Sequence, residues 1–180
     1  MTPTEPRKVI LYIATSLDGY IAKPNDDLAF LDIVQKPGED YGYGDFIETV
    51  DTVIMGRKTY DWVISKVPEF PHEDKNTYVI TRNARQDAGK VKFYSGNLKG
   101  LIEKIRSEEG QNIFCDGGSE IANELLKDNL IDEMVISIIP ILLGDGIRLF
   151  KDGRPEQRLV LLSTKQFESG LTQLHYQVAM

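Results

Sequence analysis

The stretch from Asn112 to Leu126 places a short apolar run directly before two glycines and a helical pattern, and it constrains the fold most strongly. The apolar run is typical of a strand that is buried on both faces. Gly117 and Gly118 interrupt it, and a helix is expected from about Ser119, which is an N-cap residue type. A helix N-terminus carries unpaired N–H groups, and glycine lets an anion approach the backbone. The stretch therefore indicates either a pyrophosphate cradle or an ordinary tight turn.

The remaining sequence alternates strand and helix patterns up to about residue 130, and only strand patterns follow. Residues 23–44 are rich in glycine, proline and acids, which predicts a long loop with one helical turn at 27–31. Ser169-Gly170 indicates a hairpin between the last two strands. These patterns predict one α/β domain over residues 1–180, with a mostly parallel sheet and antiparallel C-terminal strands. The expected strands are 8–15, 52–55, 76–81, 91–95, 113–115, 132–140, 158–168 and 171–180, and the expected helices are 45–50, 57–64, 98–105 and 119–129.

The composition excludes several classes of protein. A net charge of −7 argues against a nucleic-acid binder, which normally carries a basic surface. The single cysteine, Cys115, excludes an intramolecular disulfide and a multi-cysteine metal site, and the two histidines are not spaced as metal ligands. Residues 1–6 are polar and do not form a signal peptide, and no apolar run approaches the roughly 20 residues of a membrane span. The sequence predicts a cytoplasmic protein without a metal or a membrane partner.

Three predicted strands end in residues that suit a bound anion. Gly56-Arg57-Lys58-Thr59 follows one strand, Thr81-Arg82 follows the next, and the glycine pair follows the third. Open α/β sheets bind ligands at the carboxyl ends of their parallel strands. Arg57 and Arg82 offer bidentate phosphate donors, and cations at a helix start are disfavoured by the helix dipole unless an anion lies nearby. The pattern favours a phosphate-rich nucleotide over a solvated helix start.

The sequence leaves the proton donor open. Asp27 lies beside Leu28 and Phe30, so it is either an acid whose pKa is raised by apolar surroundings or a first-turn acid that caps a helix. Asp45 and Glu48, just before the second strand, are the alternatives.

The other candidate side chains favour structural roles. His72 lies near prolines and acids and is expected to be exposed, whereas His175 is expected to be a hydrogen-bonded residue of the sheet. Cys115 is expected to be a small apolar core residue. Trp62 and Tyr60 are expected to cover the sheet.

Several segments together resemble the dihydrofolate reductase superfamily. They are Thr15–Ala22 (TSLDGYIA), Ile54–Tyr60 (IMGRKTY), Asp116–Glu120 (DGGSE) and Asp132-Glu133. The segment Pro140–Phe150 (PILLGDGIRLF) is similar to the reductase domain of the bifunctional riboflavin-biosynthesis deaminase/reductase. The resemblance covers nearly the whole chain, with the segments in the same order.

The resemblance implies a three-layer α/β/α fold like that of dihydrofolate reductase, with an eight-stranded, mostly parallel sheet, in a homodimer. It also implies an NADPH-dependent reductase of a pyrimidine or pterin, most similar to 5-amino-6-(5-phosphoribosylamino)uracil reductase of riboflavin biosynthesis. Asp27 would contact the substrate, and the loop after the first strand would close over the nicotinamide. The implied cofactor-binding residues are Ala14, Thr15, Ile21, Ala22, Gly56, Arg57, Lys58, Thr59, Thr81, Arg82, Gly117, Gly118, Ser119 and Glu120.

Three alternatives remain at this point. The chain lacks the His-x-Glu motif and the Cys pair of the zinc deaminase half, so the first alternative is a stand-alone reductase. The second alternative is a true dihydrofolate reductase, and the third is a nucleotide-binding protein without catalysis. The apolar run 134–143 is either a surface that reaches a partner or a buried central strand. The candidates for binding a substrate phosphate are Arg148, Lys151, Arg154 and Arg158.

Overall fold

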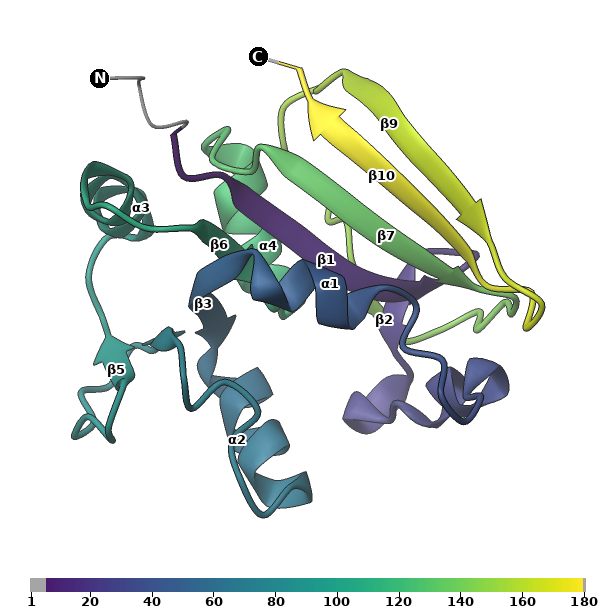
Figure 1. The fold of residues 1–180 in the computed structure, drawn as a ribbon, viewed down its shortest axis with the longest axis horizontal. Helices are drawn as coiled ribbons and strands as arrows, with labels where there is room; N and C mark the ends of the chain where they lie inside the picture. The colour runs from purple at the N-terminus through teal and green to yellow at the C-terminus, as the bar shows by residue number, and fades with distance from the viewer. Residues whose placement is uncertain (1–5, 180) are drawn as a thin grey trace.

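The computed structural model describes residues 6–179, which form an eight-stranded sheet with the order β5-β4-β3-β6-β1-β7-β10-β9 (Figure 1). Strand β10 runs antiparallel to both of its neighbours, and the strands from β5 to β7 are parallel, as predicted. Residues 1–5, on which the signal-peptide prediction depends, lie outside the described residues. The strands of the sheet are β1 (Val9–Ser16), β3 (Val50–Gly56), β4 (Asn76–Ile80), β5 (Val91–Tyr94), β6 (Asn112–Cys115), β7 (Glu133–Ile139), β9 (Leu159–Gln166) and β10 (Thr172–Val178).

The helices form where the apolar side chains recur at helical spacing. In α3 the apolar residues at 98, 101, 102 and 105 are all buried, so the predicted amphipathic helix is confirmed. The loop predicted over residues 23–44 contains two short 3₁₀ helices and the start of α1. The helices are η1 (Pro24–Asp26), η2 (Ala29–Val34), α1 (Tyr43–Glu48), α2 (Arg57–Lys66), α3 (Leu98–Ser107) and α4 (Ser119–Lys127).

Helices cover both faces of the sheet and make three layers. Val9 and Leu11 of β1 belong to the core beneath α3 and α4, whereas Tyr12 points to the opposite face and stacks on Phe46 of α1. Figure 1 shows α1 crossing one face while α4 lies behind the sheet. Because each strand near the centre is covered on both faces, it is apolar almost throughout, which explains the clear strand patterns.

The C-terminal strands show where the 134–143 run lies. Strand β7 lies between β1 and β10 and is largely buried, so most of this run is interior. Strand β9 lies at the edge of the sheet, and all eight of its residues are exposed, including the apolar residues 159–162.

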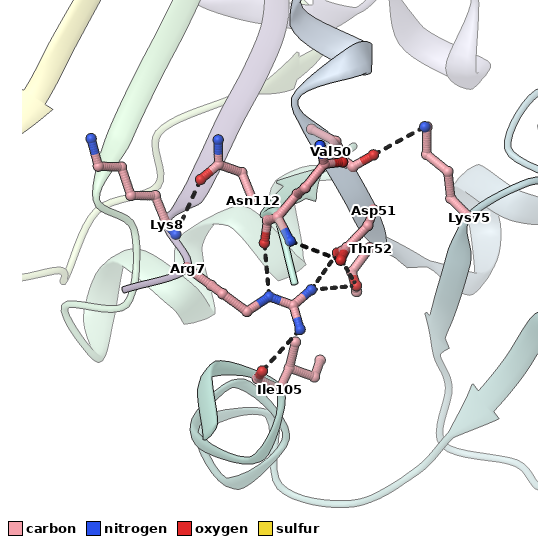
Figure 2. A network of polar contacts seen from close by, with 9 residues as sticks. Arg7, Lys8, Val50, Asp51, Thr52, Lys75, Ile105 and Asn112 are labelled. Carbon is pink, nitrogen blue, oxygen red and sulfur yellow. Dashed lines mark hydrogen bonds and ion pairs between the residues drawn. The ribbon is translucent and has the colours of Figure 1, made fainter. Parts of the chain in front are cut away.

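The amino ends of the strands are joined by a buried arginine, shown in Figure 2. Arg7 is 7% exposed and donates hydrogen bonds to the carbonyl oxygens of Ile105, at 3.0 Å, and Gln111, at 2.7 Å. Its guanidinium also donates to Thr52 Oγ1 at 2.8 Å and pairs with Asp51. Arg7 thereby ties β1, β3 and α3 together at the edge opposite the predicted site.

A two-stranded sheet that the sequence did not predict lies beside β1. Strand β2 (Tyr20–Ala22) pairs antiparallel with β8 (Ile147–Arg148), so the loop after β1 is joined to the glycine-rich segment that follows β7. Among residues 6–179, no helix has the length and apolar character needed to cross a membrane.

Candidate functional site

The three predicted strand ends lie at one edge of the sheet. Strands β4, β3 and β6 are neighbours and parallel, so their carboxyl ends meet. The turns after β3 and β6 are bonded directly to each other: Gly56 N donates to Gly117 O at 3.0 Å, and Gly118 N donates to Thr59 Oγ1 at 3.1 Å. The structure therefore brings together residues about sixty positions apart in the sequence, as their patterns predicted.

Both glycines after β6 are needed for this turn. Gly117 has φ +92°, a conformation that L side chains rarely adopt. A Cβ added to Gly118 would lie 3.3 Å from Thr59 Oγ1, so a side chain there would press on the adjoining turn. The lack of a side chain at Gly118 therefore favours the close approach of the two turns.

The helices that start from these turns have no side-chain cap. Gly56 occupies the N-cap position of α2, and Gly118 that of α4. Neither has a side chain that could accept a hydrogen bond from the first N–H groups of its helix. The predicted helix start at about Ser119 is confirmed, and Gly118 rather than Ser119 occupies the N-cap position. By contrast, α3 at the margin is capped by Asn97, whose side chain accepts from Gly100 N at 2.8 Å. The two uncapped N-termini are suited to an anion.

A basic cluster lies beside α2. Arg57 NH1 donates to Asp61 Oδ2 at 2.7 Å, and Arg85 NH1 donates to Asp61 Oδ1 at 2.8 Å. The hydrogen bond from Arg85, followed by that from Arg57, lowers the pKa of Asp61. Two further basic residues are exposed: Lys58, which follows Arg57, and Arg82, which lies three residues before Arg85. Arg85 was missed because it lies in an irregular segment after β4 and meets Arg57 only through Asp61.

Thr81 is placed at the end of β4 as expected, but its hydroxyl is used locally. Thr81 is 8% exposed, and its Oγ1 accepts from Asn83 N at 3.2 Å while donating to Asn83 O at 3.1 Å. This turn fixes the direction in which the chain leaves β4 toward Arg82 and Arg85.

The segments expected to line the nicotinamide lie at the carboxyl end of β1 and in β2. Thr15 and Ala22 are buried there, and Ala14 and Ile21 are partly buried. The glycine-rich segment packs directly on β2: a Cβ added to Gly146 would lie 2.1 Å from Ala22 O.

The loop between β1 and β2 is fastened to the glycine-rich segment that follows β7. The carboxylate of Asp18 accepts from Gly144 N at 2.7 Å, from Leu143 N at 3.1 Å and from Ser16 Oγ at 2.6 Å. The hydrogen bond from Ser16, with those from Gly144 and Leu143, lowers the pKa of Asp18 to about 2. Asp18 and the β2–β8 pairing therefore hold this loop in place, and its closure over the nicotinamide stays a prediction.

Asp27 lies in a groove between η2 and α2. It is exposed, and its Oδ1 accepts from Ala29 N at 2.8 Å, two residues along the chain, but Asp27 is not the N-cap of η2, which is Leu28. Trp62 and Lys66 of α2 line the opposite side of this groove. The prediction that Trp62 covers the sheet was wrong, since Trp62 is 37% exposed, whereas Tyr60 is buried in the core beside Phe93 as expected.

The structure removes Asp45 and Glu48 as proton donors at this site. Both are exposed residues of α1 and line a different groove with Lys8 and Gln111, which directly precede β1 and β6, and with Glu133, the first residue of β7. They therefore lie at the amino ends of the strands, away from the carboxyl-end turns.

A carboxylate that the sequence did not single out lies directly before the two glycines. The side chain of Asp116 is 28% exposed, and its Oδ2 lies 3.3 Å from Nε2 of His72. The prediction that His72 is exposed was wrong, because it is only 2% exposed and packs against Phe114. Burial and the nearby charge of Asp116 raise the pKa of Tyr43, so its phenol stays protonated beside this carboxylate.

The two remaining candidates have the predicted structural roles. Burial raises the pKa of Cys115 to about 12, as expected of a thiol within the core. His175 Nε2 contacts Glu133 Oε2 at 2.8 Å within the sheet. In the part of the chain that the structure describes, no group of three or more His, Cys, Asp or Glu side chains is placed to hold a metal ion.

The site fits a dinucleotide by its donors. Two uncapped helix N-termini and a turn open to the backbone suit a diphosphate, and the guanidinium groups of Arg57 and Arg85 suit a further phosphate. These groups lie along one edge of the sheet, next to the end of β1.

Comparison with known proteins gives one family match over most of the chain. Residues 7–173 match the family model of the RibD C-terminal domain. The Bacillus subtilis (strain 168) protein YwjB, which is uncharacterized, is 44% identical over 172 residues, covering 94% of this chain and 97% of YwjB.

Solved structures agree with this match. A Shewanella sp. PV-4 protein, named as a candidate riboflavin biosynthesis protein, is 32% identical with a TM-score of 0.88, covering 96% of this chain and 99% of that one. The Thermotoga maritima diaminohydroxyphosphoribosylaminopyrimidine deaminase/5-amino-6-(5-phosphoribosylamino)uracil reductase is 14% identical with a TM-score of 0.70, and the match covers 97% of this chain and 57% of that one. The predicted fold is confirmed.

Proposed function

The chain belongs to the RibD C-terminal domain family, and on this premise we propose that it is an NADPH-dependent reductase of a pyrimidine or pterin-like substrate. The substrate proposed is most like 5-amino-6-(5-phosphoribosylamino)uracil, on which the T. maritima relative is named as acting. The observation that carries the proposal is the pair of bonded turns, Gly56–Thr59 and Asp116–Ser119, each leading into an uncapped helix.

The residues around these turns would divide the binding of NADPH among them. Gly117, Gly118 and the first N–H groups of α4, at Ser119 and Glu120, would hold the diphosphate. Arg57 and Lys58, joined by Arg82, would hold the adenosine phosphate, and Thr81 would shape the turn at the end of β4 that presents Arg82. When bound, NADPH would supply a hydride to the substrate.

The first strand and β2 would orient the reacting ring. Ala14, Thr15, Ile21 and Ala22 offer a mostly buried surface, and its attachment to the glycine-rich segment keeps that surface fixed. A fixed, largely apolar wall limits the access of water to the reacting atoms.

Asp27 remains the proposed acid. It lies in the groove between η2 and α2, and α2 is the helix that begins directly after β3. Its carboxylate would bind an N–H edge of the substrate or pass a proton to it. Asp27→Asn is expected to lower turnover by about a hundredfold or more, the lower end of the usual contribution of a general acid. Unchanged turnover with an unchanged pH profile would remove Asp27 from this role.

The cofactor is testable with a native probe, because Trp62 is the only tryptophan of the chain and lines the same groove. NADPH is expected to quench Trp62 fluorescence at lower concentration than NADH, since the basic cluster favours a 2′-phosphate. No quenching by either cofactor would refute the proposal. Turnover with 5-amino-6-(5-phosphoribosylamino)uracil or dihydrofolate then distinguishes the two substrates, and binding without turnover of either would favour a nucleotide-binding protein without catalysis.

We also propose a homodimer, for which the exposed edge strand β9 gives the support. Unpaired strand edges that carry consecutive apolar side chains readily pair with another chain, and closed dimers are the usual outcome. Light scattering is expected to give twice the chain mass of 20.3 kDa. The cytoplasmic location expected from the sequence stays a prediction.

A further inference from the structure

His72 is a polar side chain that the stability of the fold does not explain. It is 2% exposed and lies between the rings of Phe70, 5.4 Å away, and Phe114, 5.9 Å away, both edge-on. Its Nδ1 is buried and has no hydrogen-bond partner among the described residues. A buried polar atom without a partner costs free energy that a phenylalanine in the same aromatic pocket would avoid.

The polar contact that His72 makes is directed at the glycine turn. Its Nε2 lies 3.3 Å from Oδ2 of Asp116, the residue directly before Gly117. A carboxylate can only accept, so the proton of the imidazole belongs on Nε2, and Nδ1 is left as an unpaired acceptor. The bond thus holds one oxygen of Asp116 from within the core.

The other oxygen of Asp116 is free to accept a hydrogen bond from a ligand. Oδ1 accepts no hydrogen bond from residues 6–179, and the side chain is 28% exposed. Asp116 follows Phe114 on the same face of β6, the face covered by α1, whereas α4 covers the opposite face. The carboxylate is therefore directed away from the helix N-terminus that suits a diphosphate, and it lies near Tyr43 of α1.

We propose that His72 is a positioning residue that fixes the carboxylate of Asp116 so that its open oxygen accepts an N–H group of the substrate ring. This deepens the proposed function and rests on it. A fixed anionic acceptor selects ring N–H and amino groups, as a uracil or pterin carries, over a plain carbonyl compound. His72 would be retained for this purpose at some cost in stability.

The pair itself is testable without activity. The chain has only two histidines, so ¹⁵N-histidine labelling gives two ring systems, and His175→Gln assigns them. The ring of His72 is expected to be protonated at Nε2 and bare at Nδ1, and Asp116→Ala is expected to shift the Nε2 resonance of His72 only. A His72 protonated at Nδ1 alone, or one unaffected by Asp116→Ala, would overturn the proposal.

Two substitutions separate positioning from structural support. His72→Phe keeps the ring contacts and removes the donor, and His72→Gln restores a donor. For His72→Phe we expect unfolding stability equal to or above wild type, an NADPH Kd within twofold, and a substrate KM about tenfold higher, the loss expected for one hydrogen bond to a charged group. His72→Gln should recover much of that KM. His175→Gln is the matched control and should leave KM unchanged.

The outcomes are distinguishable from failure of the reductase proposal. The probes are 5-amino-6-(5-phosphoribosylamino)uracil and dihydrofolate, measured by turnover or, without turnover, by quenching of Trp62 in the NADPH-loaded protein. If the wild-type protein does not bind NADPH, the reductase proposal is refuted, and so is the role of His72 that rests on it. The NMR experiment would still test the hydrogen bond between His72 and Asp116. NADPH binding without binding of either probe would overturn recognition by Asp116. A His72→Phe variant with the wild-type KM would overturn the role of His72. So would a double variant, His72→Phe with Asp116→Ala, in which the increases in KM of the two single variants multiply in full.

Discussion

Replacing Gly146 with alanine should displace the wall of the proposed nicotinamide site. Gly146 has φ +140°, and its added Cβ would lie 2.1 Å from Ala22 O and 3.2 Å from Lys23 Cα. These are backbone atoms, so no flexible side chain can turn away. Relief requires β2 and the glycine-rich segment to separate by more than 1 Å, which weakens the β2–β8 pairing.

The magnitude follows from two costs. A side chain in this glycine-only backbone region costs about 1–3 kcal/mol, and each weakened hydrogen bond costs about 1 kcal/mol more. We expect Gly146→Ala to lower the free energy of unfolding by about 2–4 kcal/mol. Gly144→Ala is the matched control: it also has positive φ, at +76°, but nothing lies within 4 Å of its Cβ, so about 1–2 kcal/mol is expected.

Urea denaturation, monitored by Trp62 fluorescence, measures the loss of unfolding free energy in each variant. The dependence of this free energy on urea concentration should be the same in the two variants and the wild type, which shows that the same unfolding reaction is compared. NADPH titration of the folded variants then tests the link to the site, because Ala22 moves only in Gly146→Ala. Equal losses of stability for the two variants, or unchanged NADPH affinity for Gly146→Ala, would refute this reasoning.

Three further perturbations test other parts of the molecule. Arg7→Met should lower the unfolding free energy by about 3–5 kcal/mol in urea, since Asp51 loses its partner and two carbonyls lose donors; a loss below 1 kcal/mol would contradict the assigned network. The pKa of Asp18 is lowered from 3.8 to about 2, so its contribution to stability is present above about pH 4 and lost as the pH falls toward 2; Asp18→Asn should be less stable than wild type at pH 7, and the difference should vanish near pH 2. Leu161→Lys on β9 should convert the dimer to a monomer in light scattering, and a wild-type monomer would end the proposal.

The sequence predicted those features that depend on local periodicity. The four apolar residues of α3 recur at helical spacing and are buried, and the apolar strands at the centre are covered on both faces. The convergence of the strand ends was also predictable, because parallel neighbours end at the same edge of a sheet. The glycines mark this edge, since Gly117 requires its positive φ.

The features that were missed depend on contacts between distant residues. Strand β8 has only two residues and pairs with β2 from more than a hundred positions away, so it has no periodicity to detect. His72 is buried by Phe114 although its sequence neighbours are polar. The hydrogen bond between Asp18 and Gly144 and the pairing of Arg85 with Asp61 likewise depend on how the loops meet in space. No pattern within a single segment carries such information.

The place of β1 in the sheet has a consequence for synthesis of the chain. Strand β1 lies between β6 and β7, which begin only at Asn112 and Glu133. At roughly 5–20 residues per second, a ribosome takes several seconds or more to deliver them after β1 has emerged. During that interval the apolar segment VILYIATS can pair with neither β6 nor β7. Strand β1 is therefore synthesised before its two neighbours and must wait for both of them before it is paired on each side. Slower elongation should therefore raise the demand for chaperones on this nascent protein.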